Sequence, residues 1–236
     1  MQAVVLAGGK GTRLAPYTNI LPKPLMPIGN MPILEVMIRQ MKHAGFEEVI
    51  LTVGHLAELL QAFFNNGNRY GLKIRYSFED KPLGTAGPLA LVGGLTDTSL
   101  VCNGDVLTNL DLKDLLRFHD EKKGIATIAM HHRLVNVNLG VIQSNDNNEI
   151  TDYLEKPSLE YMVSMGIYIF EPAVLNYIQP NTYLDFPDLV HKLLSAGVKV
   201  FGFPFDGYWQ DLGNPDDYQQ AQQDFESMQS QILMDG

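Results

Sequence analysis

The first residues that could do chemistry form a glycine-rich loop, Gly8 to Leu14, directly after an apolar N-terminal segment. Three glycines allow backbone N–H groups to approach a polyanion closely, and Lys10 and Arg13 add positive charge. Two familiar phosphate-binding motifs are excluded by the spacing. A Rossmann fingerprint needs a third glycine where Leu14 stands, and a Walker P-loop needs Ser or Thr where Gly11 follows the lysine. The loop therefore predicts an anion site of another kind, with a plain turn between strand and helix as the alternative.

A lysine between two prolines follows, as Pro22-Lys23-Pro24. Prolines restrict the backbone and so lower the entropic cost of aiming the lysine side chain. Solvated lysines beside prolines are common, and the tripeptide alone indicates little. Because it begins nine residues after Arg13, it favours a second cation for the same anion.

Two aspartates stand at positions that suit a metal ion. Asp105 ends an apolar strand candidate, and Asp211 lies much later, between Trp209 and Gly213. Mg²⁺ usually takes one or two protein carboxylates and fills its coordination sphere with phosphate oxygens and water. The alternative is a turn cap at Asp105 and a surface ion pair at Asp211.

The elements that must position these residues alternate along the chain. Apolar runs rich in Val and Ile, such as residues 49–53, alternate with segments of helical period, and this order predicts an α/β fold. We expect a doubly wound, mostly parallel, Rossmann-like sheet flanked by helices, with a small strand-rich lobe within residues 125–170. The expected strands cover 2–7, 48–53, 73–78, 99–102, 125–130, 138–143, 165–170 and 198–203, and the expected helices 31–44, 55–65, 85–94, 111–122, 185–196 and a polar segment from about 215.

Composition excludes several classes of protein. The chain has 236 residues and a net charge of −10, which argues against a nucleic-acid binder but permits small phosphorylated ligands. Cys102 is the only cysteine, so a disulfide framework and a cysteine zinc cluster are excluded. No apolar run reaches the ~18 residues of a membrane span, and the N-terminus lacks a basic signal-peptide region. We therefore expect a cytoplasmic protein with neither membrane nor nucleic acid as a partner.

The motifs together resemble the sugar-1-phosphate nucleotidylyltransferases, and are most similar to the catalytic domain of mannose-1-phosphate and heptose-1-phosphate guanylyltransferases. The resemblance implies Mg²⁺-dependent transfer of a nucleotidyl group from a nucleoside triphosphate, GTP by preference, to a sugar 1-phosphate, giving NDP-sugar and pyrophosphate. The alternatives are a uridylyl- or thymidylyltransferase, and a non-catalytic regulatory paralogue that binds NDP-sugar. In order, the motifs are Gly8 to Leu14 with Pro22-Lys23-Pro24, Pro82 to Leu89, Asn103-Gly104-Asp105, Glu155-Lys156-Pro157 and Gly207 to Gly213.

The resemblance also implies roles for individual residues. Arg13 would hold the departing pyrophosphate and Lys23 would neutralise the α-phosphate, while Asp105 and Asp211 would hold Mg²⁺. A phosphate monoester is already a nucleophile, so catalysis would rest on alignment and charge neutralisation. The predicted nucleotide-binding residues are Leu6, Ala7, Gly8, Gly9, Gly11, Thr12, Arg13, Glu79, Gly84, Thr85, Asn103 and Gly104, and the predicted sugar-phosphate-binding residues are Gly140, Glu155, Lys156, Ser164 and Gly166.

Two further residues bear on recognition of the base and of the sugar. Glu79 ends a strand candidate and could accept both donors of a guanine edge, with an exposed acidic turn as the alternative. Ser164 stands where many relatives have asparagine, which alters an expected sugar contact. We expect one domain over residues 1–236, with a nucleotide-binding half to about 124, a sugar-binding part over about 125–213, a C-terminal helix over 214–236, and a homodimer as in relatives.

Overall fold

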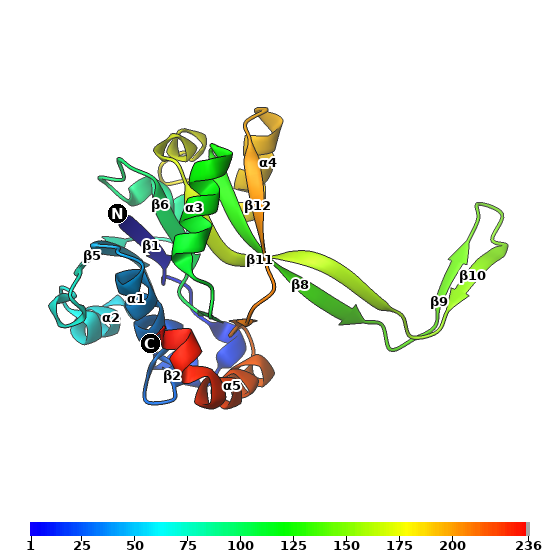
Figure 1. Cartoon of the computed structure of the whole chain (residues 1–236), viewed down its shortest axis with the longest axis horizontal. Coiled ribbons are helices and arrows are strands. Elements are labelled where there is room, and N and C mark those ends of the chain that lie inside the picture. The colour runs from blue at the N-terminus through cyan, green and yellow to red at the C-terminus, as the bar shows by residue number, and fades with distance from the viewer. Residues whose placement is uncertain (235–236) are drawn as a thin grey trace.

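The computed structural model describes residues 1–234 and has a mostly parallel sheet of seven strands at its centre (Figure 1). Strand β11 is antiparallel to both of its neighbours, and every other adjacent pair is parallel. The doubly wound α/β fold expected from the alternating pattern is confirmed. In sheet order the strands are β12 (Val200–Phe205), β8 (Ala126–Asn136), β11 (Ser158–Phe170), β6 (Ser99–Asn103), β1 (Gln2–Leu6), β4 (Glu48–Val53) and β5 (Lys73–Phe78).

Three short antiparallel pairs accompany the sheet. They join β2 (Pro27–Ile28) to β3 (Met31–Pro32), β7 (Val106–Thr108) to β13 (Trp209–Asp211), and β9 (Val141–Ser144) to β10 (Ile150–Leu154). The pair β7–β13 matters most for the site, because it places Asp211 opposite Val106, the residue that follows Asp105.

Helices cover both faces of the sheet. The α-helices are α1 (Ile33–His43), α2 (Ala57–Phe64), α3 (Leu112–Lys122), α4 (Phe186–Ser195) and α5 (Pro215–Leu233), and the 3-10 helices are η1 (Thr12–Leu14), η2 (Tyr17–Asn19), η3 (Lys23–Leu25), η4 (Asn68–Tyr70), η5 (Gly87–Leu91) and η6 (Pro172–Tyr177). The helix expected over 85–94 is only the short η5, because Pro88 lies near its start and two glycines follow it. Within residues 1–234, no helix combines the length and apolarity needed to cross a membrane.

Alternate residues of the central strands enter different cores. Val5 and Leu51 pack under α1, α2 and α3, whereas Val4 and Ile50 pack under η5, η6 and α4. A sheet covered on both faces needs strands that are apolar on both faces, which is the pattern seen in the sequence. A third cluster lies under α5, where Phe225 packs with residues of β2 and β7, and fixes the segments that border the site.

Strands β8 and β11 are the longest of the sheet, and they continue beyond it as a two-stranded arm (Figure 1). We call residues 131–163 the arm. Its tip is the β9–β10 hairpin, which stands clear of the body of the molecule (Figure 1). The strand-rich segment expected within 125–170 is therefore divided between the main sheet and this arm.

Candidate active site

A pocket of about 290 Å³ lies where β1 and β6 end. These strands are neighbours in register, with Leu6 opposite Asn103, so the residues that follow them meet at one edge of the sheet. Ligands of open α/β sheets bind at this carboxyl edge. The pocket is lined by Leu6, Ala7, Gly9, Gly11, Thr12, Arg13, Lys23, Pro24, Gly104 and Asp105.

The glycine-rich loop has a conformation that its sequence requires. Gly11 has a φ of +61°, and a Cβ placed there would lie 3.0 Å from the side chain of Thr18 and 3.2 Å from that of Lys23. Thr18 is buried, and its hydroxyl donates a hydrogen bond of 2.8 Å to the Gly11 carbonyl oxygen. The loop is therefore held against the segment that carries Lys23.

Lys23 connects the two aspartates. Its Nζ donates a hydrogen bond to Asp105 Oδ2 and lies 3.9 Å from Asp211 Oδ1. Asp211 is brought there by β13, and the Leu212 N–H donates to the Asp105 carbonyl oxygen at 3.1 Å. Burial and the nearby Asp105 carboxylate raise the pKa of Asp211, against the opposing effects of Lys23 and Arg13. The site thus concentrates negative charge around one ammonium group.

The Arg13 guanidinium lies over Gly213. A Cβ at Gly213 would lie 3.1 Å from one terminal nitrogen of Arg13 and 3.2 Å from the other. Gly213 is not among the site residues predicted from the sequence. Its place two residues after Asp211, within the last motif, is the signal that could have identified it.

Glu79 follows β5 and lies on the other side of the glycine-rich loop. Its carboxylate lies against the backbone of Gly8 and Gly54, where a Cβ would lie 2.3 and 3.1 Å from Oε1, and Oε2 accepts a hydrogen bond of 3.2 Å from the Leu83 N–H. Burial raises the pKa of Glu79, and the Leu83 hydrogen bond opposes this. Glu79 therefore borders the loop without lining the pocket around Lys23.

The structure gives Gly84 and Thr85 a structural role. Gly84 has a φ of +80°, and a Cβ there would lie 2.5 Å from the Leu184 carbonyl oxygen. The amide and hydroxyl of Thr85 donate to Asp185 Oδ1 at 2.9 and 3.2 Å, and the Phe186 N–H donates to the Thr85 hydroxyl at 2.8 Å. These residues join the loop to the start of α4, and their nucleotide contact stays a prediction.

Asn103, Ser164 and Gly166 lie together beside the end of β6. Gly166 has a φ of +71°, and a Cβ there would lie 2.5 Å from Asn103 Nδ2. The Gly166 N–H donates to the Ser164 hydroxyl at 3.3 Å, at the point where the β8–β11 register shifts. Trp209 Nε1 donates to the Met165 carbonyl oxygen at 3.0 Å and ties this bend to β13.

Three predicted sugar-phosphate residues are not brought to the pocket. Gly140, Glu155 and Lys156 all belong to the arm, and none of them lines the pocket. Lys156 Nζ lies 3.9 Å from Glu155 Oε1, with exposed fractions of 66% and 62% for the two side chains. The Tyr153 ring covers Gly140, and its hydroxyl donates to Glu155 at 3.3 Å. Because β8 and β11 stay paired as far as their ends, they carry these residues away from the body.

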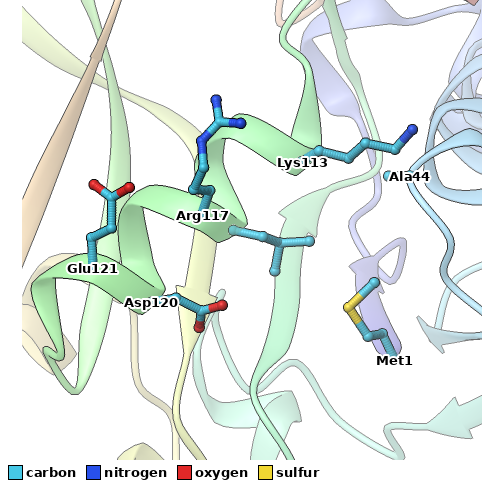
Figure 2. Close-up of a pocket in the computed structure, with 7 residues that line it drawn as sticks. Met1, Ala44, Lys113, Arg117, Asp120 and Glu121 are labelled. Carbon is cyan, nitrogen blue, oxygen red and sulfur yellow. The ribbon is translucent and has the colours of Figure 1, made fainter.

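A larger hollow of about 480 Å³ lies at the opposite edge of the sheet, between Met1 and α3 (Figure 2). It is bordered by Lys113, Arg117, Asp120 and Glu121, whose charged groups spread apart and share no common focus (Figure 2). Arg117 is also paired with Asp114 at 2.6 Å. This hollow lacks the convergent groups of the pocket at the carboxyl edge.

Comparison with known proteins decides the family. The family model described as "Nucleotidyl transferase" matches residues 2–228, which is nearly the whole chain. The chain belongs to the nucleotidyl transferase family. Relatives include a UTP–glucose-1-phosphate uridylyltransferase from Synechocystis, 38% identical over 94% of this chain, and a mannose-1-phosphate guanylyltransferase from Mycobacterium tuberculosis, 35% identical over 92% of this chain. The chain spans 62% of the length of each of these two relatives.

The fold is also that of solved members. A structure titled as a putative glucose-1-phosphate thymidylyltransferase from Bacillus anthracis superposes with a TM-score of 0.75, at 26% identity and 94% coverage of both chains. The resemblance inferred from the motifs is therefore confirmed at the level of the nucleotidyl transferase family.

The donor set of this nucleotidyl transferase fits a small divalent cation. Asp105 and Asp211 converge on the Lys23 ammonium, which shows that both carboxylates can face one positive charge. Within residues 1–234, no cluster of three or more His, Cys, Asp or Glu side chains is arranged for a metal. A cation at the two aspartates would need further ligands from phosphate and water, as Mg²⁺ prefers.

Proposed function

We propose that this chain is a sugar-1-phosphate nucleotidylyltransferase, which transfers a nucleotidyl group from a nucleoside triphosphate and releases pyrophosphate. One arrangement carries the proposal. Lys23 faces Asp105 and Asp211 beside the glycine-rich loop and Arg13, all at the carboxyl edge of the sheet. A binding module for a neutral ligand would not need these charges.

In the proposed reaction, an oxygen of the sugar phosphate attacks the α-phosphorus of the nucleotide. A new P–O bond forms to the sugar phosphate, the bond between the α-phosphorus and the bridging oxygen breaks, and pyrophosphate carries away the electron pair. The attacking group is already ionised, so the protein needs no nucleophile of its own. Its work is alignment and the neutralisation of charge.

The residues of the pocket divide this work. The backbone of the glycine-rich loop and the Arg13 guanidinium would hold the β- and γ-phosphates. Arg13 suits that place because its planar group makes forked contacts with phosphate oxygens. Lys23 would leave Asp105 and place its point charge at the α-phosphate, where negative charge builds up in the transition state.

Asp105 and Asp211 would hold Mg²⁺ when the nucleotide binds. The bound ion would neutralise phosphate charge and favour departure of pyrophosphate. Its presence would also relieve the repulsion between the two aspartates once Lys23 turns toward the substrate.

We propose GTP as the nucleotide, with Glu79 accepting hydrogen bonds from the guanine edge. Support comes from guanylyltransferases among the relatives and from the position of Glu79 beside the loop. The uridylyltransferase relative favours UTP as the second candidate, with transfer to glucose 1-phosphate. For the sugar phosphate, we propose Glu155 and Lys156 as ligands of hydroxyl groups and phosphate.

A matrix assay tests the proposal. Pyrophosphate release is measured with four triphosphates against glucose, mannose, heptose and amino-sugar 1-phosphates, with Mg²⁺ and with a chelator. We expect release that requires both substrates, is greatest with GTP, and stops with the chelator. Preference for UTP or dTTP would overturn the base assignment, and activity undiminished by the chelator would overturn the metal assignment. Nucleotide-sugar binding without pyrophosphate from any pair would instead indicate a regulatory protein.

A further inference from the structure

Beyond the main sheet, the arm is a ribbon of only two strands, and no layer of the described residues packs against it. Its two strands pair from Met130 and Ser164 out to Asn136 and Ser158, and the Val137 N–H donates to the Pro157 carbonyl oxygen at 3.0 Å. The third strand, β12, accompanies β8 only as far as His131. A two-stranded ribbon alone in water is marginally stable, so the arm needs a surface to cover it.

The arm carries apolar surface that the rest of the molecule does not cover. Among the described residues, ten of the seventeen exposed large apolar side chains lie on it. They are Leu134, Val135, Leu139, Ile142, Ile150, Tyr153, Leu154, Leu159, Tyr161 and Met162. Paired residues of antiparallel strands share a face, so Leu159 with Val135 and Tyr161 with Arg133 form one face of the ribbon. An exposed patch of this kind marks an interaction site.

The base of the arm is fixed on both sides. His131 Nδ1 is hydrogen-bonded to the Phe205 carbonyl oxygen at 2.9 Å, and β12 pairs with β8 across Met130 and His131. On the other strand, Trp209 Nε1 holds the Met165 carbonyl oxygen. Folding the arm back over its own pocket would break these contacts and the strand ladder. The arm that carries Lys156 thus leads away from the body (Figure 1), and Lys156 does not line the pocket of its own chain.

Charge indicates what surface the arm would meet. Between residues 131 and 163 there are five acidic side chains against Arg133 and Lys156. We call residues 8–24, which border the pocket, its rim. They contain the exposed cations Lys10 and Arg13 and no acidic residue. Close to Arg13 on this rim lie Tyr17 and Ile20, which are 63% and 79% exposed. The rim thus offers positive charge and apolar surface, and the arm offers negative charge and apolar surface.

We propose that two copies of this chain exchange arms, so that Glu155 and Lys156 of each copy complete the sugar-phosphate site of the other. A two-fold dimer satisfies both arms and both pockets by the same contact, and exchange of an identical element is a low-cost route to such a dimer. The exchange rests on the proposed function for the role of Lys156, and on the structure alone for the dimer itself.

Complementation between two inactive variants tests the exchange. Asp105→Asn removes a carboxylate from the pocket and leaves the arm unchanged. Lys156→Ala removes the ammonium from the arm and leaves the pocket unchanged. The two are co-expressed with different tags and the heterodimer is isolated through both. We expect about half of the wild-type pyrophosphate release, because one of its two sites combines an intact pocket with an intact arm. A heterodimer no more active than either variant alone would overturn the exchange.

The matched control combines two pocket defects, Asp105→Asn and Arg13→Ala. Neither site of this heterodimer has an intact pocket, so we expect no recovery. Recovery in the control would show that activity returns by some route other than arm exchange, and would also overturn the proposal.

Sedimentation equilibrium separates the dimer from the catalytic proposal, because it needs no substrate. We expect the wild type to be a dimer, and Leu159→Glu/Tyr161→Glu to be a monomer with an unchanged far-UV spectrum. The control Leu194→Glu changes an exposed leucine of α4 and should stay dimeric. A wild type that stays monomeric, or an arm variant that stays dimeric, would contradict the exchange. A dimer dissociated only by the arm variant would support it even if no substrate pair gave pyrophosphate.

Discussion

Lys23 Nζ donates a hydrogen bond to Asp105 Oδ2, although 82 positions of sequence separate the two residues. Lys23 is buried, and its ammonium also lies within 3.9 Å of Asp211. In the free protein this group holds together two carboxylates that would otherwise repel each other. The same ammonium is the one we propose for the α-phosphate, so in that proposal substrate and carboxylates would compete for it.

Replacement of Lys23 should therefore affect both folding and activity. We expect Lys23→Met to lower the free energy of unfolding by about 1–3 kcal/mol, because it leaves a partly buried carboxylate without its partner. We also expect kcat/KM for pyrophosphate release to fall at least ~100-fold. Urea unfolding and the release assay measure the two effects. Lys113→Met, an exposed lysine of α3, is the control, and equal stability of the two variants would contradict the pairing argument.

A single methyl group should displace Arg13. Gly213→Ala places a Cβ 3.1 to 3.3 Å from the Arg13 guanidinium, so this group must shift. We expect the efficiency of pyrophosphate release to fall about 10-fold, as for a misplaced phosphate contact. Stability should change little, as in the control Gly93→Ala, which has open space around its Cβ. Unchanged kinetics would show that the position of Arg13 over Gly213 does not matter.

The buried carboxylate of Glu79 should lower the stability of the folded protein at neutral pH. Its pKa is raised by burial, so the folded protein takes up a proton more readily than the unfolded chain, and stability falls as pH rises through that pKa. We expect Glu79→Gln to raise the urea midpoint at pH 7, with the gain shrinking toward pH 4.

The same variant should weaken binding of a guanine nucleotide about 10-fold, because the amide cannot accept both donors. Isothermal titration measures this effect, with Asp80→Asn, its exposed neighbour, as the control. Unaltered guanine nucleotide affinity in Glu79→Gln would remove Glu79 from base recognition.

Far from the site, the ionised carboxylate of Glu48 should make the stability of the folded protein depend on pH. The hydrogen bond from Lys73, together with those from Gln2 and Arg75, lowers the pKa of Glu48 to about 2. A depressed pKa stabilises the fold above the unfolded value, and this is lost as pH falls toward the folded one. We expect Glu48→Gln to cost about 1–2 kcal/mol at pH 6. The difference from wild type should shrink between pH 4.5 and 2 in urea titrations, and a constant difference would contradict the ion-pair origin.

Much of the fold could be predicted because the strands have simple patterns. The run from Val49 to Val53 is apolar on both faces, and such a run predicts a covered strand. Strands β7 and β13 are three residues each, which is too short for an alternation of apolar and polar residues to stand out. The helix expected over 85–94 forms only the short η5, because Pro88 lies near its start and two glycines follow it. The helical period of the apolar residues does not reveal this effect.

The pocket was predictable where chemistry depends on strand ends. Asp105 follows β6, and parallel strands bring their ends to one edge, so its meeting with the loop after β1 follows from topology. The position of Lys156 on an arm away from the pocket could not be predicted in the same way. Alternation predicts that two strands pair but does not say whether the ribbon lies on the body or leaves it, and here it leaves. The approach of Arg13 to Gly213 is a tertiary contact that spacing does not encode.

The central claim is that Asp105 and Asp211 act as one unit around a shared cation. Steady-state pyrophosphate release with Mg²⁺ is measured for wild type, Asp105→Asn, Asp211→Asn and the double variant. We predict that each single variant loses at least ~100-fold in kcat/KM and that the double variant loses little more, because residues that act as a unit are not additive. Full activity in either single variant, or losses that multiply in the double variant, would contradict the account.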